Sequence, residues 1–167
     1  MSLETAVELT GTPAEYTEGF NFNGIVATDD GADLIAVKSN TGQLFWISLD
    51  GFEITEIDLG GQALKVGDGI ALDGQTLFVT RNMLGLIVPV ELSDDFSSGA
   101  VGEPFTAGSL HFPTTIAQVN SCILVVNSQF DRREREPELP FTVALIAIPG
   151  GMMASQESMV RPAVEGC

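Results

Sequence analysis

Two short motifs in this sequence carry side chains that could bind a divalent cation. Asn23 precedes a glycine in Phe-Asn-Gly-Ile, and Asp68 precedes a glycine in Gly-Asp-Gly-Ile. Amide and carboxylate oxygens are the hard ligands that Ca²⁺ and Mg²⁺ prefer, although Ca²⁺ takes roughly six to eight of them, so two do not complete a site. Asn-Gly and Asp-Gly are also turn dipeptides, because Asn, Asp and Gly tolerate left-handed backbone angles. From the spacing alone, turn chemistry is favoured over metal binding.

The two motifs belong to an internal repeat. Segments that start at Asn23, Asp68 and Pro113, each 45 residues after the last, contain a short strand, a turn and a second, more apolar strand. A period of about 40–50 residues made of short strands is typical of a β-propeller blade. An ordinary β-sandwich is the alternative, but it does not need such a repeat.

The repeat predicts an all-β fold of about three four-stranded antiparallel blades, which is half of a six-bladed propeller. No stretch has a sustained helical period. The expected third strands are Gln43–Leu49, Leu86–Glu91 and Thr142–Ile148, and the expected fourth strands are Glu53–Leu59 and Ala100–Phe105. The blades are predicted at residues 20–60, 61–107 and 108–149, after an N-terminal segment 1–19 with a possible outer strand at Ala6–Leu9 and before a flexible tail 150–167.

A propeller would gather the polar residues of the repeat on one face. The inner strand of each blade runs along a central channel, so Asn23, Asp68 and Pro113 would surround one channel mouth. The loops after the second strands would form its rim. His111, the single histidine, would reach this mouth as a general base only if its loop turned inward; a lone loop histidine is more often simply exposed. The substrate-binding residues predicted around this mouth are Arg81, Asn82, His111 and Asn127.

The same residues resemble a known superfamily. Phe22-Asn23-Gly24-Ile25 and Gly67-Asp68-Gly69-Ile70 are similar to motifs of the gluconolactonase, senescence marker protein and luciferin-regenerating enzyme propellers, which neighbour the strictosidine-synthase-like propellers. The resemblance covers residues 20–148 and implies the carboxy-terminal half of a six-bladed, metal-dependent lactonase. It implies Asn23 and Asp68 as ligands of a divalent metal, most often Ca²⁺, and Asp68 as the base that activates water. The family's early-blade Glu ligand has no counterpart here.

Composition excludes several classes of partner. The chain has 23 acidic and 7 basic residues and a formal net charge of −16, so neither nucleic acid nor an anionic membrane is an expected partner. The acidity favours solubility first and attraction for cations second. No apolar run approaches the roughly 20 residues that span a bilayer. No secretory signal is recognisable, but the compartment stays open because a longer parent protein could be secreted.

The two cysteines are not expected to form a disulfide. Cys122 lies in an apolar run, where a small buried side chain is expected, and Cys167 is the last residue. A bond between them would require the tail to reach a buried strand.

Two functions therefore remain open from the sequence. The chain is a segment of a lactonase-type hydrolase that acts on a small molecule, or it is a non-catalytic propeller module for binding or scaffolding. Three blades do not close a ring, and an open arc of this kind would expose two apolar blade faces. Closure by a second copy related by a two-fold axis, or by a missing N-terminal half, would cover them. The missing half is favoured.

Overall fold

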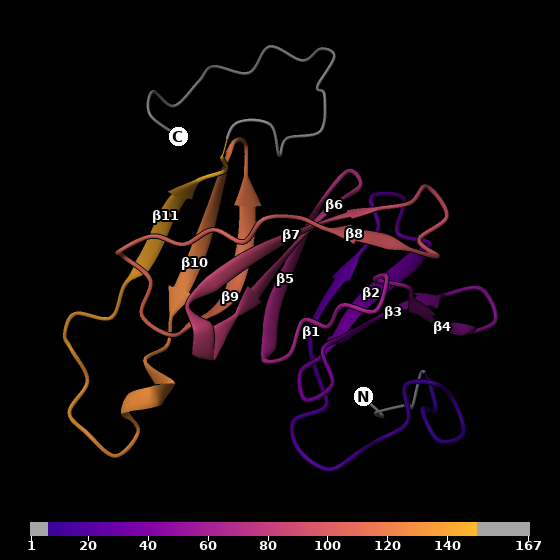
Figure 1. Ribbon diagram of the computed structural model, residues 1–167, viewed down its shortest axis with the longest axis horizontal. Coiled ribbons are helices and arrows are strands. Elements are labelled where there is room, and N and C mark those ends of the chain that lie inside the picture. Colours follow the sequence, from indigo (N-terminus) through magenta and orange to yellow (C-terminus); the bar gives the residue numbers. More distant parts are fainter. Residues whose placement is uncertain (1–6, 150–167) are drawn as a thin grey trace, which may run out of the picture.

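The computed structural model describes residues 7–149 and is built almost entirely of antiparallel β-sheet (Figure 1). Its first sheet holds β1 (Phe22–Ala27), β2 (Asp33–Lys38), β3 (Gln43–Ser48) and β4 (Ile54–Ile57). The second holds β5 (Gly67–Asp73), β6 (Thr76–Arg81), β7 (Leu86–Leu92) and β8 (Gly99–Val101). The third holds β9 (Pro113–Val119), β10 (Cys122–Asn127) and β11 (Val143–Ala147). Two short 3₁₀ helices, η1 (Asn82–Leu84) and η2 (Phe130–Arg132), complete the described elements.

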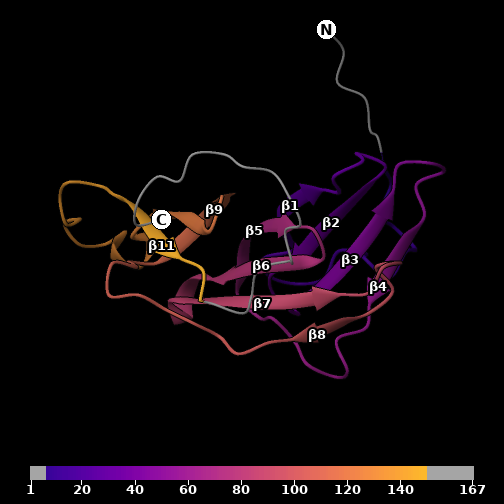
Figure 2. The same ribbon diagram turned by 90° about the horizontal axis from the view of Figure 1, so that it is seen from above.

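Each sheet is a meander whose consecutive strands are hydrogen-bonded neighbours. The first strands of the three sheets, β1, β5 and β9, lie side by side, and β8 lies on the opposite side of the molecule (Figure 2). The sheets therefore fan out from one line of inner strands, as propeller blades do. The predicted fold class, an all-β partial propeller, is confirmed. The third sheet has three strands within the described residues, and the exact limits of the blades stay a prediction.

The second sheet packs against both of its neighbours, because its side chains alternate between its two faces. In β6, Leu77 and Val79 belong to the apolar cluster shared with the first sheet, whereas Phe78 between them belongs to the cluster shared with the third. All three side chains are fully buried. Since successive side chains of a strand point to opposite faces, a strand buried on both faces is apolar throughout, which is why the second strand of this repeat reads as a continuous hydrophobic run.

The two outer faces of the fan differ. The outer face of the first sheet, which includes Phe45 and Ile47, packs against Ala14 and other residues of the preceding segment, and these three side chains are buried. The strand expected at Ala6–Leu9 is absent over residues 7–9, and residue 6 lies outside the described chain. This segment nevertheless covers the first sheet, so the expectation of two open faces is wrong for one of them.

The outer face of the third sheet is open and apolar. It presents side chains that are between 39% and 59% exposed, namely Val119, Val126, Val143 and Leu145. Cys122 is buried, as expected, but it is disulfide-bonded. The expectation of no disulfide is therefore wrong, because it assumed that a buried strand would be out of reach. The other cysteine and the predicted tail lie outside the described residues.

No helix among residues 7–149 is long and apolar enough to cross a membrane.

Candidate functional site

Each inner strand begins with a β-bulge, and the candidate ligands lie in two of these bulges. In β1, Phe22 is opposite Lys38, but the next pair is Ile25 with Ala36, so one extra residue is accommodated at Asn23-Gly24. The registers of β5 and β9 shift in the same way, at Asp68-Gly69 and at Thr114-Thr115. A bulge turns the strand locally and re-aims its side chains. The structural counterpart of Asn23 and Asp68 in the third sheet is therefore Thr114, one residue after the Pro113 that the 45-residue spacing predicts.

The glycines of the two motifs allow the inner strands to approach closely. A Cβ atom on Gly24 would collide with the carbonyl oxygen of Asp68 and lie 3.0 Å from the backbone nitrogen of Ile70. A Cβ atom on Gly69 would collide with the carbonyl oxygen of Thr114 in the same manner. Neither glycine is among those with a positive φ. The interpretation of Asn-Gly and Asp-Gly as turns is thus wrong: both lie inside strands, and the glycine is required by packing.

Asp68 is a buried carboxylate fixed by one neighbour. Its side chain is 9% exposed, and its Oδ2 accepts a 2.7 Å hydrogen bond from Nδ2 of Asn82. Burial raises the pKa of Asp68 above its ordinary value, and the hydrogen bond from Asn82 offsets part of that rise. Within the described chain, the other carboxylate oxygen, Oδ1, receives no hydrogen bond. The site therefore holds one anchored and one available oxygen.

Asn82 is itself held rigidly. It begins η1, where its backbone N–H donates to the carbonyl of Val66 at 3.2 Å and its Oδ1 accepts from the N–H of Met83 at 2.6 Å. Because both ends of its amide are engaged, Asn82 presents its N–H to Asp68 in one orientation. The sequence predicted Asn82 as a substrate-binding residue, and the structure brings it to the predicted ligand.

Asn23 lies on the neighbouring strand in a different environment. Its side chain is exposed and makes no hydrogen bond with the described residues. The contact of Gly24 with the carbonyl of Asp68 places the two bulges next to each other. Among residues 7–149, no group of three or more His, Cys, Asp or Glu side chains forms a metal cluster. This chain therefore offers two oxygen donors on adjacent strands and, in the described part, no third acidic ligand.

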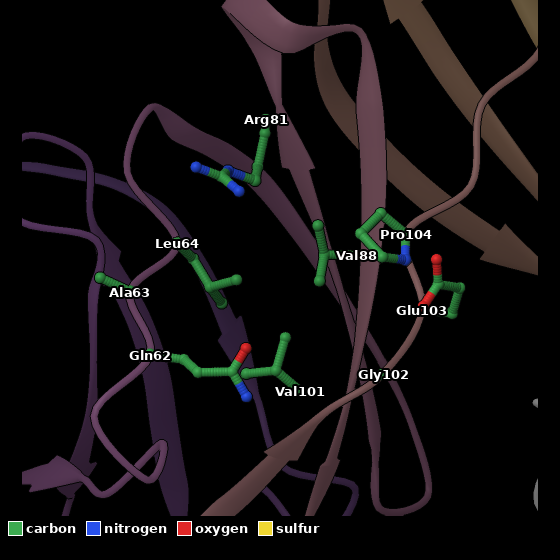
Figure 3. Close-up of a pocket in the computed structure, with 9 residues that line it drawn as sticks. All are labelled: Gln62, Ala63, Leu64, Arg81, Val88, Val101, Gly102, Glu103 and Pro104. Atoms are coloured by element: carbon green, nitrogen blue, oxygen red, sulfur yellow. The ribbon is translucent and has the colours of Figure 1, made fainter.

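Arg81 faces a pocket between the segment that joins β4 to β5 and the second sheet. Its Nε donates a 2.9 Å hydrogen bond to the carbonyl of Lys65. The side chain then lines a pocket whose other walls include Leu64, Val88 and Val101 (Figure 3).

His111 and Asn127 are joined to each other on the third sheet. The side chain of Asn127 is 1% exposed; its Oδ1 accepts from the backbone N–H of His111 at 2.9 Å. Its Nδ2 donates to the carbonyl of Ser109 at 2.7 Å and to Oγ1 of Thr142 at 2.9 Å. Asn127 thereby ties two loops together, and His111 is exposed at the surface of one of them.

The sequence reasoning missed Thr80. Its hydroxyl is fully buried and lies 2.9 Å from the carbonyl oxygen of Gly69 and 2.7 Å from that of Thr114. Its one proton is shared between these two acceptors, so Thr80 links the bulges of β5 and β9. A signal was present, because Thr80 is a polar residue that ends the apolar run Leu77–Val79 directly opposite the bulge.

Comparison with known proteins shows the fold. No protein-family model and no curated protein matches the sequence. Among solved structures, hydrazine synthase from Kuenenia stuttgartiensis is similar over 76% of this chain and 45% of that chain, with 12% identity and a TM-score of 0.54. Virginiamycin B lyase from Staphylococcus aureus matches over 78% of this chain and 42% of that chain, with 17% identity and a TM-score of 0.45. These are propeller-type proteins. The chain therefore spans less than half the length of either and is a propeller segment.

Proposed function

We propose that this propeller segment supplies Asn23 and Asp68 as oxygen ligands of a divalent cation, Ca²⁺ first, in a lactone hydrolase of the gluconolactonase type. The observation that carries the proposal is the Asp68 carboxylate, which is buried, anchored through one oxygen by Asn82 and left with the other oxygen available. The resemblance of both Asn-Gly and Asp-Gly motifs to that superfamily adds the reaction class.

The donor chemistry of the two bulges fits such a cation. An amide oxygen and a carboxylate oxygen are both hard ligands. Their number falls short of the roughly six to eight oxygens that Ca²⁺ takes, so further ligands would come from water, substrate or another part of the propeller. When bound, the cation would polarise the lactone carbonyl as a Lewis acid.

Asp68 is the proposed general base. Burial raises the pKa of Asp68 in the absence of a cation, and a cation bound to the same carboxylate would lower it. Asn82 keeps Oδ2 in place, which orients Oδ1 to take a proton from water. On the substrate side, His111 contacts the small molecule directly, and Asn127 acts by holding the His111 loop. Arg81 contributes from the pocket that it lines.

The alternative is a non-catalytic module for binding or scaffolding within a larger propeller. The open apolar face of the third sheet supports a role in assembly, because a further blade would cover it. Closure by a second copy and closure by a missing half would both require a blade on the face of the first sheet that the preceding segment covers, so this face does not distinguish the two. A missing half of the propeller stays the partner that we propose.

The experiment compares Asp68→Asn with Asp73→Asn, after light scattering has established the mass of each sample. Asp73 is a matched control: it ends the same strand, accepts a hydrogen bond from an amide, that of Gln118, and also has a raised pKa caused first by burial. Ca²⁺ is expected to raise the melting temperature of the wild type and of Asp73→Asn, but not of Asp68→Asn. Lactone hydrolysis should be lost only in Asp68→Asn.

Two results would reject the proposal. Equal hydrolysis by Asp68→Asn and the wild type would remove Asp68 as the base. A melting temperature that does not respond to Ca²⁺ in any variant, with no turnover of a lactone panel, would favour the non-catalytic module.

A further inference from the structure

The pocket that Arg81 lines does not include Asn23 or Asp68. It is a cavity of about 430 Å³ between the segment that joins β4 to β5 and the sheet β5–β8 (Figure 3). Small-molecule sites typically measure about 300–1,000 Å³ and combine apolar walls with a few polar groups. The lining residues are Gln62, Ala63, Leu64, Arg81, Val88, Val101, Gly102, Glu103 and Pro104.

The floor of the pocket is apolar and held in place. Leu64 and Val88 are each 1% exposed and belong to the core between the first two sheets. The backbone of Leu64 is fixed at both ends, since its N–H donates to the carbonyl of Gly42 at 2.8 Å and its carbonyl accepts from Gly67 at 3.0 Å. This rigid core supports the accessible apolar lining, which comes from Val101 and Pro104, so the hydrocarbon part of a ligand meets a pre-formed surface.

Arg81 brings an uncompensated positive charge to the pocket. Its Nε is anchored on the carbonyl of Lys65, which leaves the two terminal amino groups of the guanidinium for another partner. In the described part of the chain, the single ion pair joins Arg132 to Glu138. Arg81 therefore has no acidic partner there, although the chain contains 23 acidic residues. A planar guanidinium fixed at one nitrogen is suited to bind a carboxylate.

Glu103 brings the opposite charge to the other side. Figure 3 shows Arg81 and Glu103 on different walls, with Val88 between them in that view. Glu103 is exposed and, like Arg81, has no ion-pair partner among the described residues. The pocket thus presents a cationic group and an anionic group across an apolar surface, and they do not neutralise each other directly.

We propose that this pocket binds a small zwitterion with an apolar body. The carboxylate of the ligand pairs with Arg81, its hydrocarbon segment lies against Val101 and Pro104, and its ammonium group pairs with Glu103. Arg81 is shared with the proposed hydrolase, but neither Asn23 nor Asp68 lines this pocket, so binding of the zwitterion is measured independently of lactone hydrolysis.

The test uses three probes of matched length: 6-aminohexanoate, hexanoate and hexylamine. Binding is measured by calorimetry, and the site is located by amide chemical shifts in the isotope-labelled chain. We expect 6-aminohexanoate to bind most tightly, with shifts centred on Val88, Val101 and Gly102. Arg81→Gln should weaken it about tenfold or more, to the level of hexylamine, and Glu103→Gln should weaken it to the level of hexanoate.

The controls change the same charges elsewhere. Arg135→Gln and Glu134→Gln lie in an exposed loop of the third sheet and should leave 6-aminohexanoate binding unchanged. Both pocket variants alter partly or fully exposed side chains, so they are expected to fold. The proposal is overturned by equal binding of the three probes, by equal effects of Arg81→Gln and Arg135→Gln, or by the absence of binding at millimolar probe.

Discussion

The start of β1 and the start of β5 have the same local architecture and different environments. Both contain a bulge, and both place a glycine against the backbone of the next inner strand. Asn23 is nevertheless exposed and makes no hydrogen bond with the described residues, whereas Asp68 is buried and bonded to Asn82. The strand β5 contacts β1 on one side and β9 on the other, whereas the described chain has no inner strand before β1.

The comparison distinguishes two causes: the repeated sequence determines the glycine, and the position of the strand in the arc determines the burial of the residue before it. The glycine is needed wherever one inner strand meets the next, so it recurs at Gly24 and Gly69. The polar residue before it is buried where another inner strand precedes its own, as at Asp68 and Thr114, and it is exposed at Asn23, where the described chain has no preceding inner strand. Among the three bulge residues Asn23, Asp68 and Thr114, Asp68 is the carboxylate, and its burial raises its pKa.

The largest predicted effect concerns the shared glycines. In Gly69→Ala, the new methyl group would meet the backbone of β9, with the Cα of Thr115 at 2.7 Å and the nitrogen of Ile116 at 2.9 Å. Backbone cannot move aside as a flexible side chain can, so we expect a loss of about 3 kcal/mol in the free energy of unfolding. Gly24→Ala should lose a similar amount against β5. Urea unfolding followed by the fluorescence of Trp46 measures both.

Gly108→Ala is the matched control for these variants. A Cβ atom at Gly108 would have no heavy atom within 4 Å, and its φ is not positive. Its free energy of unfolding should stay within about 1 kcal/mol of the wild type. If Gly69→Ala were as stable as Gly108→Ala, close packing of the inner strands would not be the reason for the glycine.

The sequence predicts the three sheets well because each strand is encoded locally. Two features of the sequence place the strands: apolar runs such as Leu77–Val79 and the 45-residue period. In the structure, successive residues of that run pack on opposite faces of the sheet. The register is not encoded in that way: the third bulge lies at Thr114, because strand pairing rather than sequence spacing fixes it. The segment that covers the first sheet was predicted to hold a strand at Ala6–Leu9 but has none over residues 7–9, and its packing on Phe45 depends on tertiary contact.

The candidate site is predicted less completely, for the same reason. Asn82 and Asp68 are 14 residues apart in the sequence and meet only because β5 and β6 pair and η1 follows. Arg81, its neighbour in the chain, points instead into the pocket beside Leu64, because consecutive residues at the end of a strand face different ways. Residue type therefore identified the polar positions, and the sheet geometry decided which of them meet.

The second prediction uses pH to examine Asp68, the buried one of the two candidate ligands. In metal-free buffer, unfolded Asp68 ionises near its ordinary pKa of 3.8, whereas burial raises the pKa in the folded chain. Between those two values the folded state retains a proton that the unfolded state releases, so this carboxylate lowers the free energy of unfolding as the pH rises through that window. Asp68→Asn removes the titration and keeps an oxygen for Asn82. The free energy of unfolding of Asp68→Asn, relative to that of the wild type, should therefore rise with pH. This rise is expected over the usual titration range of a carboxyl group, roughly pH 3.5 to 7.

Denaturant unfolding of both proteins across that range provides the measurement. The difference between them is the relevant quantity, because other carboxyl groups titrate equally in both. A difference that stays constant with pH would mean that Asp68 has the same pKa in the folded and unfolded chains, and that the two bulges do not differ in polarity.

The smallest predicted effect concerns Asn23. Its side chain is exposed and has no hydrogen bond to lose, so Asn23→Ala should change the free energy of unfolding by no more than about 0.5 kcal/mol in metal-free buffer. Asp68→Ala, by contrast, leaves the N–H of Asn82 without its acceptor and should cost about 1–3 kcal/mol. Thermal unfolding of the two alanine variants, side by side, measures the contrast. Equal losses would show that Asn23 is buried against a neighbour in solution, and the presence of a preceding inner strand would then no longer explain the burial of Asp68.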